Sequence, residues 1–201
     1  MPDDITGFDP ARDVQLDLVG LRALAHPLRV RLLGRLRLYG PATASRLAHD
    51  LGESSGATSY HLRQLELHGF IEEDPERGTK RERWWRSVHR GTRFDMTLND
   101  ENRETGGQYL RAVARSYSER MLDFADIVED VPATYGPDWA DACTLSDWLM
   151  TLTAERAKAL NEELFEVLAR YRDRDDAPPP EGARKFVAQV QLFPLAPLPE
   201  S

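Results

Sequence analysis

Apolar residues in the first third of the chain recur every three or four positions, which predicts a series of helices. Val14–Leu24 is the first, and His26-Pro27 separates it from the next because a residue before proline avoids the helical region. Pro27 suits the first turn of a second helix that ends at Gly40-Pro41. Two short helices follow, Ala44–Leu51 and Ser55–His68, with Thr43 as the N-cap of the former and Gly69 as the C-cap of the latter.

The period of the pattern then changes to that of strands. Phe70–Glu73 and Arg83–Val88 predict two short strands, and the polar stretch Asp74–Glu82 between them contains Pro75 and Gly78. This arrangement indicates a β-hairpin with a basic tip.

Beyond Phe94 the pattern becomes mainly helical again. We predict a helix over Asn99–Val131, a loop over Pro132–Asp141, a short strand at Trp148–Leu152 and a helix over Ala154–Tyr171 that Thr153 caps. Asp173–Gly182 is predicted to be a linker, and the alternation of side chains between two faces in Phe186–Phe193 predicts a strand.

The fold class predicted is therefore mainly α with a small β component (α+β). We expect four regions: a flexible N-terminus (1–13), a domain of helices and hairpin (14–94), an acidic helical region for dimerisation and any effector (95–193) and a tail (194–201).

Charge separates the two main regions. The whole chain carries a net charge of −8, which alone disfavours a nucleic-acid partner. Arg22–Arg93, however, contains 14 basic and 8 acidic residues and all five histidines, a balance of +6, so the remainder stands at −14. Because screening removes the influence of distant charges, the local balance matters for a polyanionic partner.

Cysteine content and hydropathy exclude several classes of protein. The one cysteine, Cys143, cannot form an intrachain disulfide or a Cys-only zinc site, and we expect it to be a small buried residue. No apolar run approaches the length of a membrane span, and the acidic N-terminus has no signal-peptide core, so a cytoplasmic protein without a membrane partner is expected. No bound metal or other cofactor is predicted.

The order helix, helix, tight turn, helix, hairpin is typical of a winged helix-turn-helix. Its second short helix, from Ser55, carries one apolar stripe for anchoring and small or polar residues on the other side, as a helix that enters the DNA major groove requires. Arg63 is placed to reach a guanine or a phosphate, and Arg77, Lys80 and Arg81 at the hairpin tip suit phosphate or minor-groove contact. The predicted DNA-binding residues are Thr43, Ser54, Ser55, Gly56, Thr58, Ser59, Tyr60, His61, Arg63, Gln64, Arg77, Lys80, Arg81 and Arg83.

Three segments resemble the ArsR-type winged-helix regulators: ALAHPLRVRLL at Ala23–Leu33, ASRLAHDLG at Ala44–Gly52 and SYHLRQLELHGFIE at Ser59–Glu72. The resemblance covers roughly Leu16–Val88. It implies a recognition helix at Ser55–His68, a wing at Glu72–Arg86, a dimer and, in most members, repression of transcription. Metal-sensing members carry a Cys-x-Cys pair in or beside the recognition helix, which this sequence lacks, so a thiolate metal sensor is not expected.

Other interpretations stay open at this point. The main prediction is a sequence-specific regulator that binds double-stranded DNA as a homodimer, acting as a repressor at an inverted-repeat operator. The alternative is a winged-helix adaptor that binds another protein. An enzyme is not expected, because the chain has no nucleophile elbow, Walker loop or His-Glu-x-x-His helix. The aromatic residues Tyr135, Trp139, Trp148 and Phe165 are candidates for an effector pocket, although they also suit core packing, and His61 also suits a structural role.

Overall fold

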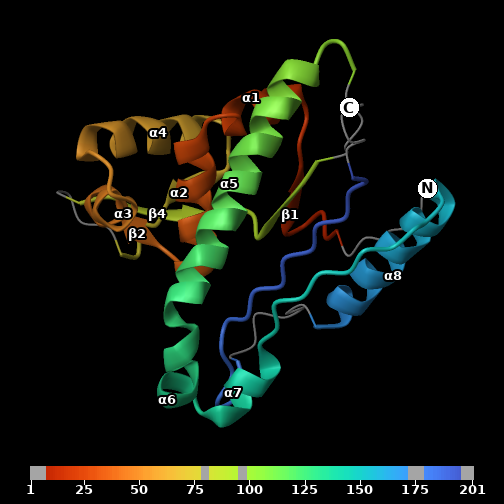
Figure 1. Ribbon diagram of the computed structural model, residues 1–201. Helices are drawn as coiled ribbons and strands as arrows, with labels where there is room; N and C mark the ends of the chain where they lie inside the picture. The colour runs from red at the N-terminus through yellow and green to blue at the C-terminus, as the bar shows by residue number, and fades with distance from the viewer. Residues whose placement is uncertain (1–7, 78–81, 95–98, 172–178, 196–201) are drawn as a thin grey trace, which may run out of the picture. The chain divides into compact units, whose positions relative to one another are not determined.

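The computed structural model describes residues 8–77, 82–94, 99–171 and 179–195. It divides the chain into two compact units, one formed by Asp9–Leu145 and the other by the described residues from Ser146 onward together with Phe8. Helices predominate and the strands are short, so the fold is of the α+β class (Figure 1). The predicted linker and tail, and the start of the predicted N-terminal region, fall mainly outside the described residues.

Three helices predicted from the sequence lie where expected. They are α2 (Pro27–Tyr39), α3 (Ala44–Leu51) and α4 (Ser55–Leu67). Local chemistry explains the bounds of α2: Pro27 stands in its first turn, the Nδ1 atom of His26 accepts a hydrogen bond from the Leu28 N–H at 3.2 Å, and Gly40 ends it with φ 85°.

The first helix begins later than predicted. Val14 lies in a strand, β1 (Asp13–Gln15), which pairs in parallel with β5 (Gly91–Arg93), and α1 spans Leu18–Leu24. Asp17 sets this start, because its carboxylate accepts the Gly20 N–H at 2.7 Å as an N-cap. A Cβ at position 91 would overlap Oδ1 of Asp13, so any residue other than glycine there would force the Asp13 side chain to move.

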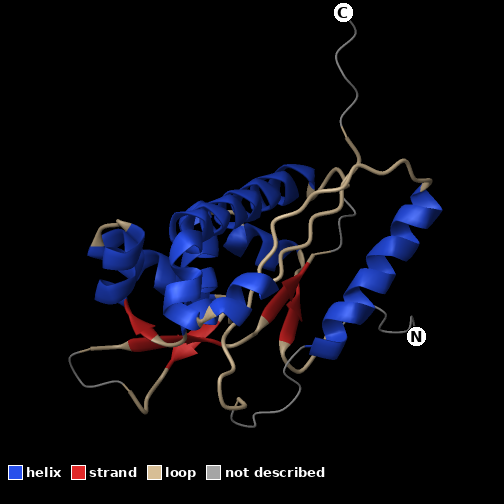
Figure 2. Ribbon diagram, turned by 60° about the horizontal axis from the view of Figure 1, so that its bottom comes forward, coloured by secondary structure: helices blue, strands red, loops and turns tan. Residues whose placement is uncertain are grey.

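The predicted hairpin is present as β3 (Ile71–Glu73) and β4 (Trp84–Ser87), which pair antiparallel. A third strand, β2 (Ala42–Thr43), pairs with the other edge of β4, so that the order in the sheet is β2-β4-β3. This two-residue strand was not predicted. It ties the segment before α3 to the hairpin. Figure 2 shows the short strands of the fold in red.

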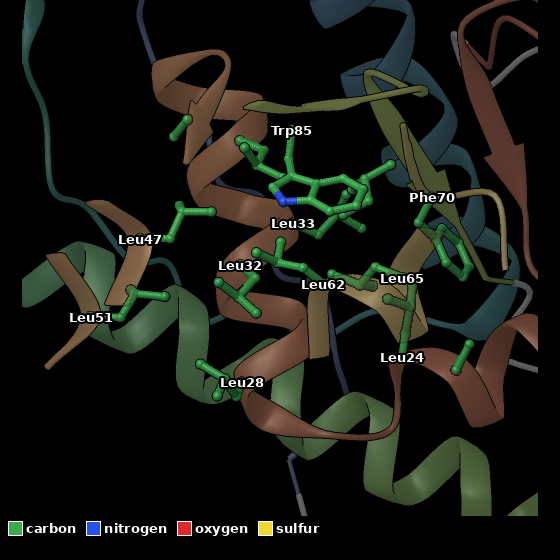
Figure 3. Packing of buried hydrophobic residues seen from close by; sticks show 14 of the residues in the cluster. Leu24, Leu28, Leu32, Leu33, Leu47, Leu51, Leu62, Leu65, Phe70 and Trp85 are labelled. Atoms are coloured by element: carbon green, nitrogen blue, oxygen red, sulfur yellow. The ribbon is translucent and has the colours of Figure 1, made fainter. Parts of the chain in front are cut away.

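The core of this unit lies between the helices and the three-stranded sheet. Leu32, Leu62 and Leu65 are fully buried, and Trp85 of β4 packs beside them (Figure 3). α2 presents Leu28, Leu32, Leu33 and Leu36 to this core, as its apolar stripe predicts. Close packing of this kind fixes the orientation of α4 relative to the hairpin.

A long helix, α5 (Arg103–Ile127), packs along α1 and α2 in the same unit (Figure 1). Its buried residues include Tyr109, which meets Phe94 edge to face at 5.7 Å between ring centroids. Pro132–Asp141, predicted as a loop, instead contains α6 (Val131–Tyr135) and α7 (Pro137–Ala142), after the 3-10 turn η1 (Val128–Asp130). Pro132 and Pro137 each stand in the first turn of a short helix. The missing N–H of proline costs no hydrogen bond there, because the first N–H groups of a helix have no partner within it.

The second unit contains α8 (Ala154–Tyr171), at the predicted bounds, and Oγ1 of Thr153 accepts the Arg156 N–H at 3.3 Å. The structure assigns no strand to Trp148–Leu152 or to Phe186–Phe193, so both strand predictions, the second of which rested on alternation, were wrong. An alternating pattern shows which side chains share a face, but a strand also needs a neighbour to which its backbone can hydrogen-bond. Neither segment pairs in this way with another part of the chain that the structure describes.

Two smaller features complete the fold. Cys143 is half-buried rather than buried, and its thiol donates to the Trp139 carbonyl at 3.1 Å. None of the helices in the described ranges combines the length and apolar character that crossing a membrane requires.

Candidate nucleic-acid interface

The two short helices α3 and α4 meet at a tight turn whose backbone features have local causes. Thr43 caps α3 by accepting the Arg46 N–H at 3.3 Å. Gly52 ends that helix in the left-handed region with φ 65°, which glycine adopts without strain. Ser54 then caps α4 by accepting the Ala57 N–H at 3.2 Å. The two caps and the glycine therefore define the angle between α3 and α4.

The helix α4, predicted to be the recognition helix, has two contrasting faces. Thr58, Leu62 and Leu65 are fully buried and anchor it to the core. On the opposite side Gly56 and Arg63 are exposed and the Tyr60 ring is 56% exposed, while Ser55 is exposed at the start of the helix. A Cβ at Gly56 would meet nothing within 4 Å, so the first turn presents open backbone to a partner. This face offers hydroxyls, an aromatic ring and a guanidinium.

A hollow of about 360 Å³ lies between the start of α3, the middle of α4 and the hairpin. Arg63 and Arg83 bring two positive charges to it from α4 and from the residue before β4. Glu82 is its acidic member, and its remaining lining is hydroxyl-bearing or apolar: Thr43, Ala44, Ser45, Ser59 and Trp85. The hollow joins the helix and the hairpin into one surface.

The wing is the segment between β3 and β4, together with those strands. Arg77 lies 3.5 Å from the Asp74 carboxylate, and Arg83 lies 3.7 Å from that of Glu73. Both arginine side chains are more than half exposed, so water screens their side of each ion pair, although the Asp74 carboxylate itself is buried. Lys80 and Arg81 lie outside the described residues.

Burial changes the part that two predicted residues can play. Thr43 is buried and caps α3, and Thr58 is fully buried beneath α4. We therefore assign Thr58 to positioning the interface rather than to its surface, and Thr43 chiefly to capping α3, although it also lines the hollow. Ser59 and Gln64 are half-buried, while Ser54 is exposed but its hydroxyl is engaged as the cap of α4.

His61, in the middle of α4, lies against His26, with 4.1 Å between ring centroids and 33° between ring planes. Burial lowers the pKa of both imidazoles, and the positive charge of Arg29 lowers them further. Nδ1 of His61 is buried and finds no hydrogen-bond partner among the described residues. The two rings pack the start of α2 against α4, which agrees with the structural role that the sequence left open for His61.

Sequence reasoning missed Ser45 and Trp85 as members of the interface. Ser45 lies in the first turn of α3, and the N-cap at Thr43 was a signal that this helix end was exposed and rich in free N–H groups. Trp85 gave no comparable signal, because its place beside the hollow depends on the pairing of β4 with β2.

No metal site is apparent from the side chains that the structure describes. Within the described ranges, His, Cys, Asp and Glu side chains do not gather in groups of three that would hold an ion. Of the aromatic candidates for an effector pocket, Tyr135 and Trp148 are exposed, and Trp139 and Phe165 are half-buried.

The geometry of two capped short helices, an outward polar face and an adjoining hairpin agrees with a comparison to known families. Residues 24–74 match the family model described as a helix-turn-helix domain. The chain carries a helix-turn-helix domain. The match spans α2, α3, α4 and β3, about a quarter of the sequence, and leaves the finer subtype open. Neither a curated protein nor a solved structure matches the chain significantly.

Proposed function

We propose that this protein is a transcriptional regulator that binds double-stranded DNA in a sequence-specific manner. The observation that carries the proposal is the outer face of α4, on which Gly56, Tyr60 and Arg63 stand exposed beside a cationic hollow, with Ser55 exposed at the start of the helix. A helix of this width fits the roughly 12 Å major groove, and such side chains read base edges by hydrogen bonds and apolar contacts.

In this proposal the wing acts as a clamp that contacts the phosphate backbone of the DNA, while side chains of α4 contact the edges of the bases. Arg77 and Arg83 lie on the hairpin side of the interface, and their exposed guanidinium groups are free to face a phosphate while Asp74, which is buried, and Glu73 stay behind them. Lys80 and Arg81 belong to the same proposed clamp by their place in the sequence.

The first prediction concerns this clamp. We expect Arg77→Ala and Arg83→Ala each to weaken binding to any duplex, and to flatten the slope of log affinity against log salt by about one unit if each side chain neutralises one phosphate. Fluorescence anisotropy over a salt series measures both quantities. Arg22→Ala, which removes an exposed charge on α1, is the matched control. A changed base preference with an unchanged slope would overturn the clamp assignment.

We also propose that the regulator is a homodimer. α4 has 13 residues, or about 20 Å of helix, and one such element contacts too few base pairs for useful specificity. Apolar side chains remain exposed where the charge becomes acidic: Leu122 at 65% and Ile127 at 48% on α5. Tyr109 near the start of α5 is buried within its own chain, so we place the contact between the two chains further along this helix, at Tyr117, Met121 and Leu122.

The second prediction follows from that assembly. Light scattering at micromolar concentration should give twice the mass of one chain, and Leu122→Lys should shift the population toward single chains because it places a charge in an apolar contact. Leu67→Lys is the control, since Leu67 is similarly exposed but lies on α4. A single-chain mass both with and without DNA would contradict the homodimer.

A dimer presents two recognition helices about 34 Å apart, so the preferred operator should be an inverted repeat with half-sites one turn apart. Repression is the mode that the resemblance to ArsR-type regulators favours.

A further inference from the structure

One arginine of α2 joins three parts of the helix-turn-helix unit. Nη1 of Arg31 lies 3.2 Å from Oε1 of Glu53, and Nη2 donates to the Leu51 carbonyl at 3.2 Å. Its Nε atom forms an ion pair with Oε2 of Glu119 on α5 at 2.9 Å. A single guanidinium thus contacts both the end of α3 and the long helix.

The first two partners stand directly before the recognition helix. Leu51 is the last residue of α3, and Glu53 precedes Ser54, the cap of α4. Two bonds from one planar guanidinium fix the turn more firmly than a flexible ammonium could. Because the third partner, Glu119, belongs to α5, the position of Arg31 also depends on the position of α5.

A neighbouring pair provides a natural comparison. Arg35 and Asp123 stand one helical turn beyond Arg31 and Glu119, and they approach to 3.9 Å. This second pair also connects α2 with α5, and the structure shows the Arg35 guanidinium over the Tyr39 ring, 5.0 Å from its centroid, rather than at the turn. The two pairs therefore differ in their connection to α4.

We propose that Arg31 is a positioning residue that transmits the placement of α5 to the recognition helix. The inference rests on the proposed function, because its consequence is a change in DNA affinity. Any event that moves Glu119 on α5, such as assembly of the acidic region, alters the set of partners that hold the turn before α4. The Arg35–Asp123 pair holds the same two helices together without this consequence.

The decisive comparison is Glu119→Gln with Asp123→Asn. Each removes one negative charge from the same helix at nearly the same depth, so non-specific attraction to DNA changes equally. We expect Glu119→Gln to weaken binding to a duplex enriched from a random library by about threefold relative to Asp123→Asn, the size expected for a partly exposed ion pair. The salt slope should not differ between them, because neither residue contacts phosphate.

A double-mutant cycle tests whether the effect of Glu119 on DNA affinity passes through Arg31. Glu53 and Glu119 share Arg31 as a partner, so Glu53→Gln should cost less affinity in the Glu119→Gln background than in the wild-type protein. Additive losses would overturn the relay through Arg31. Equal affinities for Glu119→Gln and Asp123→Asn would overturn it as well.

Hydrogen exchange separates this inference from the proposed function. Without DNA, the amides of Gly52–Ala57 should exchange faster in Glu119→Gln than in Asp123→Asn, because Arg31, which holds the turn, has lost its partner on α5. If the wild-type protein bound no duplex while this difference appeared, the proposed function would fail and the positioning role of Arg31 would stand. Unchanged exchange alongside normal DNA binding would refute the positioning role alone.

Discussion

The Arg37→Leu variant should lose about 2 kcal/mol of the free energy of unfolding. Arg37 on α2 is half-buried and donates from Nε to the His89 carbonyl at 2.9 Å and from Nη2 to the Gly91 carbonyl at 3.2 Å. Burial lowers the pKa of its guanidinium to about 10, although the nearby phenol of Tyr109 and carboxylate of Asp13 favour the charged form. Removing it takes a donor from two carbonyls and a nearby cation from Asp13.

Chemical denaturation monitored by circular dichroism measures this loss. The Arg22→Leu variant is the control, since it makes the same replacement at an exposed position on α1 and should change the unfolding free energy by less than about 0.5 kcal/mol. If Arg37→Leu unfolded at the wild-type denaturant concentration, Arg37 would not be the residue that secures the β1–β5 pair to α2.

The second large effect is expected at Arg63. Its side chain is exposed on α4 beside Ser59, and it lines the hollow that also contains Arg83. A good contact between an arginine and a base contributes roughly 1–3 kcal/mol of discrimination. We therefore expect Arg63→Ala to weaken binding to the enriched duplex by about ten- to a hundredfold, and binding to a scrambled duplex much less.

Arg83→Ala is the matched variant for Arg63→Ala, because both arginines are exposed cations that line one hollow. Competition binding with duplexes that differ at single base pairs should show relaxed preference at one position for Arg63→Ala alone. Equal losses on enriched and scrambled duplexes would make Arg63 a phosphate contact instead.

The parts of the fold that local chemistry determines could be predicted from the sequence. The stop at His26-Pro27, the caps Thr43 and Thr153 and the glycine at 69 set helix bounds through neighbouring atoms alone, and the structure confirms each of these helices. The hairpin was predictable for the same reason, since its strands are close in sequence.

Elements that depend on distant partners could not be predicted in this way. The parallel pair β1–β5 joins residues almost 80 positions apart, and β2 is a strand only because β4 lies beside it. In the second unit the opposite error occurred: Phe186–Phe193 has the alternation of a strand, but it pairs with no other segment in the described ranges.

The candidate site shows the same division. Helical spacing indicated which residues of α4 face outward, and the structure places Tyr60 and Arg63 there. The hollow beside Trp85 and the three contacts of Arg31 required the tertiary arrangement, because their members come from separate helices and strands.

Fluorescence anisotropy of labelled enriched and scrambled duplexes over a salt series, with the full chain, decides whether α4 reads duplex DNA. The wild-type protein should bind both duplexes with a steep salt dependence, and it should bind the enriched duplex at least about a thousandfold more tightly. Arg63→Ala should reduce this ratio, whereas Arg83→Ala should leave the ratio unchanged and flatten the slope. Binding that neither variant changes, or no binding to either duplex, would show that α4 does not read DNA.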